Sequence, residues 1–543
     1  MRARAVRMFS GATLRPAVLA LAAALSFAAS ASDDQRALPL PRLGGDAGAE
    51  QAHRALRLLA DEDVDGARAI VEPLLSHDAG SRAVRIAAGA LAFMEHRYDE
   101  AVALLESAGP EGAGTYLTLA RATREVTKDD AVAEGEHFVV AHPKGKDEVL
   151  VPYLLEALEA QRAALEKDLG WAPSRKVRVE ILNGVRELAR LSTLTEQEIR
   201  TSGTIAICKF DKLMIVSPKA LLQGYDWLDT AAHEYTHYVV TRRTRNETPI
   251  WLHEGLAKWS ESRWRGEGGE SFSPFSAALL RDALARNDLV TFAQMHPSMA
   301  KLPSQERAAL AFAEVTLAVE YLVKKGGAPL VNRVLDLVAA GRGAEAAVAE
   351  ALGVPFERFL ADWKRYLAAR PLPKGGEHVL AMLRFKDDPR KAGDWAEWAE
   401  IQDPRARGFA RLGELFRERG KWTAARIEYG KAVRKVGLRI AILADQYAIA
   451  AMMSDAPAEA ERVLSEALVW NPDHAALHVH LSRVLVARKE YAAARTHLVL
   501  ANRQDPFDPE IHAGLATALE ALGDPGGASR EKRFAEILRD RAH

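Results

Sequence analysis

A regular spacing of alanines constrains the fold of this chain more than any other feature of its sequence. Four alanines near the C-terminal end recur at intervals of 35, 34 and 34 residues: Ala425, Ala460, Ala494 and Ala528. A small residue stands twelve positions before each of them, and a further alanine stands seven positions after each. Small residues at fixed positions let two helices approach closely, and this period is typical of helix-turn-helix repeats. The sequence therefore predicts an array of helix pairs over 405–543.

The same pattern occurs near the N-terminal end. Ala67 and Ala101 are 34 residues apart, and Ala55 and Gly89 stand twelve positions before them. The stretch from 131 to 143 keeps a helical pattern but loses the register. We therefore expect a helical repeat region over 32–146, with two repeats and a degenerate third. The alternative for both regions is a generic antiparallel bundle.

Both repeat regions resemble tetratricopeptide repeats. This resemblance implies stacked helix pairs with a concave face that binds a peptide or another protein, and no catalysis by the repeats themselves. The stretch over 371–404 is rich in proline and charge, so we expect it to be a linker. The C-terminal array would then fold as a separate unit, and a chain ending near Arg370 would still bind metal.

The first 31 residues predict a secretory signal peptide. Arginines up to Arg15 precede an apolar run over 17–29, and Ala29-Ser30-Ala31 has the form of a cleavage signal. The alternative, a membrane anchor, needs about 20 apolar residues, which is more than this run offers. We expect an exported protein in a bacterial periplasm or outside the cell, soluble after the leader is removed.

Charge and cysteine content exclude several kinds of protein. The 73 basic and 74 acidic residues give a net charge of -1, which argues against a nucleic-acid partner. Cys208 is the only cysteine, so no disulfide can form within the chain. No stretch after the leader is apolar enough to predict a membrane span.

The sequence changes character over 147–370. Alternating apolar and polar residues predict a strand over 177–182, and two apolar segments, 203–208 and 213–216, flank a polar tip and predict a hairpin. Helical segments follow, so we expect an α+β domain here. The predicted fold class is a multidomain, mainly α protein with this α+β domain between two helical arrays.

A histidine pair follows the predicted hairpin. His233 and His237 are four residues apart and would project from one face of a helix, where they could share a zinc ion. Glu234 lies next to His233 and could act as the general base on a metal-bound water. Catalytic zinc needs a third protein ligand, and the segment 251–261 offers Glu254 on a second helix. A third histidine of the metzincin type is excluded because Val240 and Arg243 occupy its required positions.

With these two segments, the chain resembles the gluzincin metallopeptidases, the peptidase MA-like clan that includes thermolysin and the relatives of aminopeptidase N. The resemblance rests on H-E-x-x-H over 233–237 followed by W-L-x-E-G-x-A over 251–257. It implies a thermolysin-like zinc peptidase domain over 147–370, with zinc bound by His233, His237 and Glu254. Departures from the family leave two points open. No G-x-M-E-N segment precedes His233, so an endopeptidase is expected rather than an aminopeptidase.

The residue that would stabilise the oxyanion is the second open point, because Phe312 stands where relatives have a tyrosine, and Tyr321 is an alternative. Glu261 is expected to accept a hydrogen bond from the free nitrogen of a metal-binding histidine. Asp229 and Thr230 are expected to cap the motif helix, and His253 is expected not to be a ligand. Two functions remain: a zinc peptidase whose arrays recruit protein substrates or partners, or a weakly active or inactive scaffold.

Overall fold

The computed structural model describes residues 48–266, 274–296, 299, 302–372, 385–387 and 398–540. The signal peptide expected over 1–31 lies outside these residues. Within the described ranges, none of the helices combines the length and the apolar character that a membrane crossing requires.

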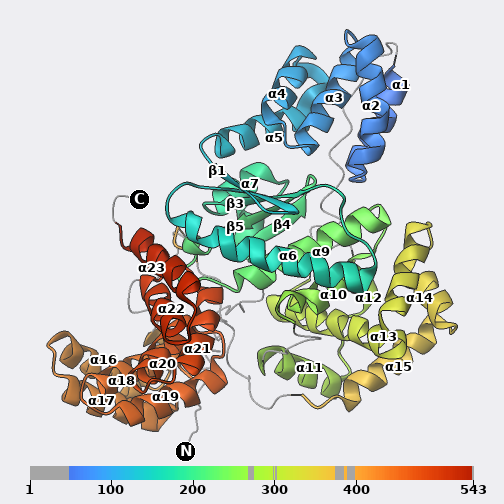
Figure 1. The fold of residues 1–543 in the computed structure, drawn as a ribbon. Helices are drawn as coiled ribbons and strands as arrows, with labels where there is room; N and C mark the ends of the chain where they lie inside the picture. Colours follow the sequence, from blue (N-terminus) through green and yellow to red (C-terminus); the bar gives the residue numbers. More distant parts are fainter. Residues whose placement is uncertain are drawn as a thin grey trace, which may run out of the picture.

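From residue 48 on, where the described part of the chain begins, five helices form the N-terminal array (Figure 1): α1 Ala49–Ala60, α2 Val64–Asp78, α3 Arg82–Met94, α4 Tyr98–Ser107 and α5 Pro110–Thr127. The small residues of the repeat pattern lie between them. Ala55, Ala67 and Ala101 are fully buried, and a Cβ atom on Gly89 would lie 2.5 Å from Leu105 Cγ. The predicted helix pairs are confirmed, and their close approach explains why those positions carry small residues.

A five-stranded sheet follows the N-terminal array. Its strands are β1 Ala131–Glu134, β2 Phe138–His142, β3 Val177–Leu182, β4 Ala206–Lys209 and β5 Lys212–Val216, in the order β1-β2-β3-β5-β4. The strands β2, β3 and β5 are parallel, whereas β1 and β4 pair antiparallel at the edges. The predicted strand and hairpin are confirmed. Phe210 and Asp211 form the two-residue turn with φ 58° and 57°, as a tight hairpin requires.

The helical pattern expected over 131–143 is wrong, because β1 and β2 occupy this stretch. The strand β2 pairs with β3, which lies about forty residues later in the chain. Local composition could not reveal this distant partner, and strand formation depends on such neighbours more than on propensity. The sheet therefore begins before residue 146, the predicted end of the helical region.

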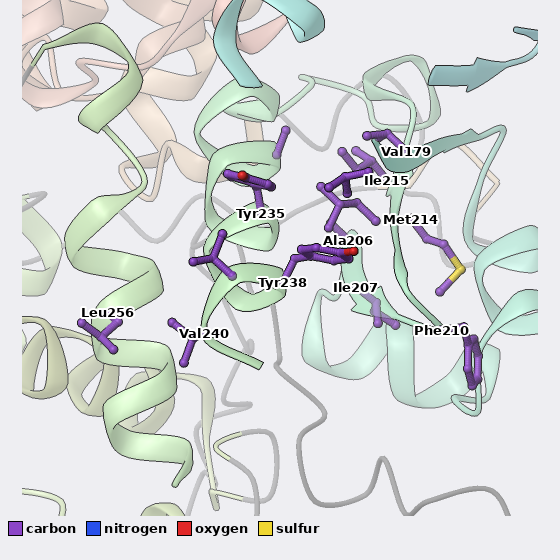
Figure 2. Packing of buried hydrophobic residues seen from close by; sticks show 14 of the residues in the cluster. Val179, Ala206, Ile207, Phe210, Met214, Ile215, Tyr235, Tyr238, Val240 and Leu256 are labelled. Atoms are coloured by element: carbon purple, nitrogen blue, oxygen red, sulfur yellow. The ribbon is translucent and has the colours of Figure 1, made fainter. Parts of the chain in front are cut away.

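In the described part of the chain, ten α-helices surround the sheet or follow it: α6 Leu150–Leu169, α7 Val185–Leu191, α8 Glu196–Ser202, α9 Trp227–Thr244, α10 Ile250–Ser260, α11 Pro274–Arg286, α12 Phe292–Met295, α13 Gln305–Ala339, α14 Ala344–Leu352 and α15 Phe356–Ala369. The helix α9 lies between the sheet and α10. Figure 2 shows Tyr238 of α9 on the side of the sheet, whereas Val240 faces Leu256 of α10. The backbone of α13 leaves helical geometry at Gly327, where φ is 66°.

Eight helices form the C-terminal array: α16 Pro404–Glu418, α17 Trp422–Val436, α18 Ala441–Met452, α19 Pro457–Trp470, α20 Ala475–Ala487, α21 Tyr491–Gln504, α22 Pro509–Ala521 and α23 Pro525–Arg539. The four alanines that define the repeat are at most 2% exposed. The predicted multidomain organisation, mainly helical with an α+β domain between two arrays, is confirmed. Figure 1 shows the two arrays on different sides of the sheet-containing domain.

The C-terminal array is not a free unit. Its first helices share a core of their own, but Phe534 and Leu538 of α23 belong to the large core that also contains the sheet. Residues 385–387 of the expected linker also pack on this domain, because Phe385 pairs with Leu221 and the Lys386 N–H donates to the Ala220 carbonyl at 2.8 Å. The end of the array therefore shares a core with the central domain, and independent folding of the array stays a prediction.

Candidate metal centre

The motif helix α9 begins at a side-chain cap. The Asp226 carboxylate accepts a hydrogen bond from the Asp229 N–H at 3.3 Å, which satisfies one free donor of the first turn. The expectation that Asp229 or Thr230 caps this helix is wrong. Asp229 lies inside the first turn, and its carboxylate accepts a hydrogen bond from Trp264 Nε1 at 2.8 Å.

Helix α10 is held on one side by Gln161 of α6 and packs on the other side against α13. The Gln161 side-chain amide of α6 donates to Thr236 Oγ1 in α9 at 3.2 Å and to the Ser260 carbonyl in α10 at 2.9 Å. On the opposite side, a Cβ atom on Gly255 would lie 2.8 Å from the Val315 carbonyl of α13. Glu254 is therefore presented to α9 by a helix that is packed tightly between α9 and α13.

The side chains of His233, His237 and Glu254 converge on one point. The two histidine Nε2 atoms lie 3.1 Å apart, and Glu254 Oε2 lies 3.4 Å from each of them. All three side chains are at most 3% exposed. Among the described residues, this is the one group of three or more histidine, cysteine or acidic side chains close enough to hold a metal ion.

The triangle of ligand atoms fits zinc. Four ligands placed tetrahedrally at zinc's usual distance of about 2.0–2.1 Å lie about 3.3 Å from each other. The measured sides of 3.1, 3.4 and 3.4 Å agree with this spacing. Two histidines and one carboxylate also form a ligand set known from catalytic zinc sites, which leaves a fourth position open.

The electrostatics of the triangle favour a cation. Burial opposes ionisation of Glu254, but His237 and the hydrogen bonds from both histidines lower its pKa to about 2. Burial also opposes protonation of His233, but Glu254 and Glu261 raise its pKa to about 9. The site therefore stabilises positive charge between the three ligand atoms.

Each metal-facing histidine is held through its other ring nitrogen. His233 Nδ1 lies 3.2 Å from Glu261 Oε2, and the Glu261 carboxylate also pairs with Lys258 at 2.6 Å. This is the contact expected of Glu261. His237 Nδ1 lies 2.7 Å from His253 Nδ1. His253 lies outside the expected ligand set, and its contact with His237 has no local signal in the sequence because only the crossing of α9 and α10 creates it.

Glu234 is buried next to the triangle. Burial raises its pKa, although the charges of His237 and His233 act in the opposite direction. The carboxylate accepts a hydrogen bond from the backbone of Cys208 in the edge strand β4. Its Oε1 atom is buried and has no hydrogen-bond partner in the part of the chain that the structure describes. A raised pKa and a free acceptor atom are what a general base at this position needs.

The residues considered for oxyanion stabilisation lie in the helical core. Phe312 is 2% exposed. Tyr321 packs against Tyr366 and Phe359, with ring centres 5.4 and 6.0 Å apart. Trp251 likewise stacks on Phe292 at 4.4 Å. The structure thus places these aromatic residues in packing roles.

Comparison with known proteins agrees with this geometry. Residues 158–369 match the model of the Peptidase MA superfamily. The chain carries a Peptidase MA superfamily domain. Residues 451–530 match the tetratricopeptide repeat, so this peptidase-type domain is followed by repeats. No curated protein matches the chain.

Several solved structures show weak similarity. Leukotriene A4 hydrolase from Saccharomyces cerevisiae is 13% identical over 76% of this chain and 67% of its own, with a TM-score of 0.30. The Pseudomonas aeruginosa protein PilF is 15% identical over 42% of this chain and 90% of its own, with a TM-score of 0.24. MamA is 15% identical over 27% and 85%, with a TM-score of 0.23. Similarities this low support no argument about function.

Proposed function

We propose that this chain is a zinc-dependent metallopeptidase that cleaves within peptide chains. The observation that carries the proposal is the buried triangle of His233, His237 and Glu254, whose sides fit a tetrahedral zinc ion. The Peptidase MA superfamily domain supports the same reaction class. Endopeptidase activity is favoured because the sequence lacks the G-x-M-E-N segment that would hold a substrate amino terminus.

The residues of the site would have distinct roles in this reaction. His233, His237 and Glu254 would hold zinc, which when bound supplies a Lewis acid that polarises a peptide carbonyl and acidifies water. Glu234 would accept the proton of the attacking water and return it to the leaving amine. Glu261 and His253 would fix the orientation of the two imidazoles.

Metal content and hydrolysis test this proposal together. The purified protein is expected to contain one zinc per chain and to cleave an unstructured protein, with the cleavage stopped by a chelator. His233→Ala and Glu254→Ala should lower bound zinc well below one per chain. Glu234→Gln should keep zinc but abolish hydrolysis, because it removes the base and no ligand. Full zinc content in both ligand variants, or undiminished hydrolysis by Glu234→Gln, would contradict the assignment.

A weakly active scaffold is the second candidate. It is favoured by the packing of Phe312 and Tyr321, which leaves the oxyanion donor unassigned among the residues we considered. Loss of one oxyanion donor lowers catalysis by about 10²–10³. In that case the protein would bind zinc stoichiometrically without hydrolysing any protein offered, and its function would lie in the repeats.

Two further features belong to the proposal. The repeat arrays would bind protein substrates or partners, as repeats of this kind commonly do. The leader predicted over 1–31 would direct export to a periplasm or the outside of the cell. Mass analysis of the mature protein from a cell fraction tests the second point, because the N-terminus should follow Ala31.

A further inference from the structure

The end of α21 in the C-terminal array meets the beginning of the motif helix α9. The Tyr225 N–H donates to the Gln504 carbonyl at 2.9 Å, and Trp227 Nε1 donates to the Asn502 carbonyl at 3.1 Å. The last carbonyls of a helix have no partner within it, so these donors complete α21. Tyr225 and Trp227 are at most 2% exposed. The contact is therefore a buried joint between the array and α9.

This joint requires a residue without a side chain. Gly224 has φ 64°, and a Cβ atom there would lie 1.8 Å from the Gln504 carbonyl oxygen. The obstructing atoms belong to the backbone of Gln504 and Asp505, so they cannot move aside as the end of a flexible side chain could. The segment before α9 and the end of α21 are thus in direct backbone contact at Gly224. A loosely attached array would not require a glycine at this position.

Arg503 adds charge to the same joint. Its guanidinium pairs with Asp226, the cap of α9, and lies 3.1 Å from Asp229 Oδ2. Burial and the nearby Asp229 charge raise the pKa of Asp226 to about 7, and the Arg503 charge opposes this rise. Arg503 therefore contacts both carboxylates at the start of α9 and offsets part of the repulsion between them.

The first turn of α9 is linked to the metal-facing residue His233. Asp229 and His233 are four residues apart and lie on one face of α9. The segment that follows α10 contacts both of them: Glu261 meets His233 Nδ1, while Arg265 pairs with Asp229 at 2.5 Å. A contact that fixes the Asp229 side chain therefore also fixes the 261–265 segment through Arg265. Glu261 belongs to this segment and is thereby kept opposite His233.

We propose that Arg503 is a positioning residue of the metal centre, and that the end of the C-terminal array is a built-in part of the metal-binding unit. Arg503 fixes Asp226 and Asp229, these fix the first turn of α9 against the 261–265 segment, and that contact aligns His233. The inference rests on the proposed zinc site. The inference goes beyond the proposed zinc site because it assigns a role to Arg503, a residue of the repeat array outside the peptidase-type domain.

The test compares Arg503→Gln with a matched control in the full-length protein. Arg530→Gln removes another ion pair between the array and the domain, Arg530 with Glu156 at 2.7 Å, without touching α9. Zinc dissociation constants are measured by competition with a chelator. Arg503→Gln should weaken zinc binding about 10-fold, the low end of the effect of losing an outer partner of a metal site. Arg530→Gln should bind zinc as the unaltered protein does.

Hydrogen exchange in the metal-free protein provides a readout that needs no activity. The amides of Asp229 and Thr230, which bond to Asp226, should exchange faster in Arg503→Gln but not in Arg530→Gln. A lysine in Arg503→Lys keeps the charge but contacts one carboxylate at a time. The zinc affinity of this variant should therefore lie between those of the unaltered protein and Arg503→Gln. It also provides the comparison if Arg503→Gln does not fold.

The outcomes separate this inference from the proposed function. If the unaltered protein binds no zinc, the proposed function fails, while faster exchange in Arg503→Gln would still support the positioning role. If the unaltered protein binds zinc and the Arg503 variants bind it equally well with unchanged exchange, the positioning role is wrong. Equal losses in Arg503→Gln and Arg530→Gln would also overturn it, because they would indicate general loosening of the array.

Discussion

The protons around the metal centre can be assigned from its hydrogen bonds. His237 can offer a lone pair at Nε2 only if its Nδ1 carries the proton, which it then donates to His253 Nδ1 at 2.7 Å. His253 must accept there, so its own proton lies on Nε2 and points to Thr241 Oγ1 at 3.1 Å. Burial holds the pKa of His253 well below its usual range, which keeps His253 a neutral acceptor.

This assignment predicts the behaviour of His253 variants. His253→Leu removes the acceptor for His237, so zinc affinity should fall about 10- to 100-fold, as is typical when an outer hydrogen-bond partner is lost. His253→Asn keeps an acceptor at this position and should stay within a few-fold of the unaltered protein. Zinc titration against a chelator of known affinity measures both. Equal affinities for the two variants would show that the contact does not position His237.

Packing between helices sets the position of the third ligand. Helix α10 carries Glu254 and lies against α13 at Gly255, where a Cβ atom would come within 2.8 Å of the Val315 carbonyl and 2.9 Å of Val319 Cγ2. A backbone carbonyl within a helix cannot move aside without disturbing that helix. Gly255 therefore determines how closely α10 approaches α13, and hence where Glu254 lies.

Substitution of Gly255 should reverse the usual effect of alanine in a helix. Alanine is favoured over glycine in a helix interior by about 1 kcal/mol, but here the clash should dominate, and overpacking typically costs about 1–3 kcal/mol. Gly255→Ala should lower both the free energy of unfolding and the zinc affinity. Gly408→Ala is the control, because a Cβ atom on Gly408 in α16 meets nothing within 4 Å. It should be neutral or stabilising in denaturant unfolding.

The elements that the sequence predicted well are those with local signals. The spacing of His233 and His237 on one helix, the hairpin turn at Phe210, and the repeat period depend on residues near each other in the chain. The cap of α9 is a local error, because Asp226 caps the helix in place of Asp229 or Thr230, whereas the larger errors concern distant partners. The stretch 131–143 forms strands because β2 pairs with β3. The contact between Arg503 and Asp226 joins residues that are 277 positions apart in the sequence. No local pattern contains such contacts.

At the scale of the whole molecule, both arrays are attached to the central domain by buried polar groups. On the N-terminal side, Tyr98 of α4 donates to Glu180 Oε1 in β3 at 2.6 Å, and Lys212 of β5 pairs with Glu180 Oε2 at 2.6 Å. The side chains of Glu180 and Lys212 are at most 1% exposed. Because the pair is buried, loss of one partner would leave an uncompensated charge.

The Glu180 contact predicts a pH dependence of stability. Burial opposes its ionisation, but Lys212 and Arg178 lower the pKa of Glu180 from 4.5 to about 2. A lowered pKa means that ionised Glu180 stabilises the folded state above pH 4.5, and that this contribution is lost as pH falls towards 2. Glu180→Gln should therefore cost about 3–5 kcal/mol at neutral pH, and less at pH 3. A difference in unfolding free energy that does not change with pH would contradict this account.

The C-terminal side predicts that the array cannot be removed without cost. A chain ending at Arg370 loses the contacts of Tyr225 and Trp227 with α21 and exposes the part of the core that Phe534 and Leu538 cover. We expect it to unfold at a lower temperature and to bind zinc more weakly than the full chain. Adding the separate 398–540 fragment should restore both properties, because the first helices of the array have their own core. An unchanged melting temperature and zinc affinity in the shortened chain would support the separable array that the sequence alone suggested.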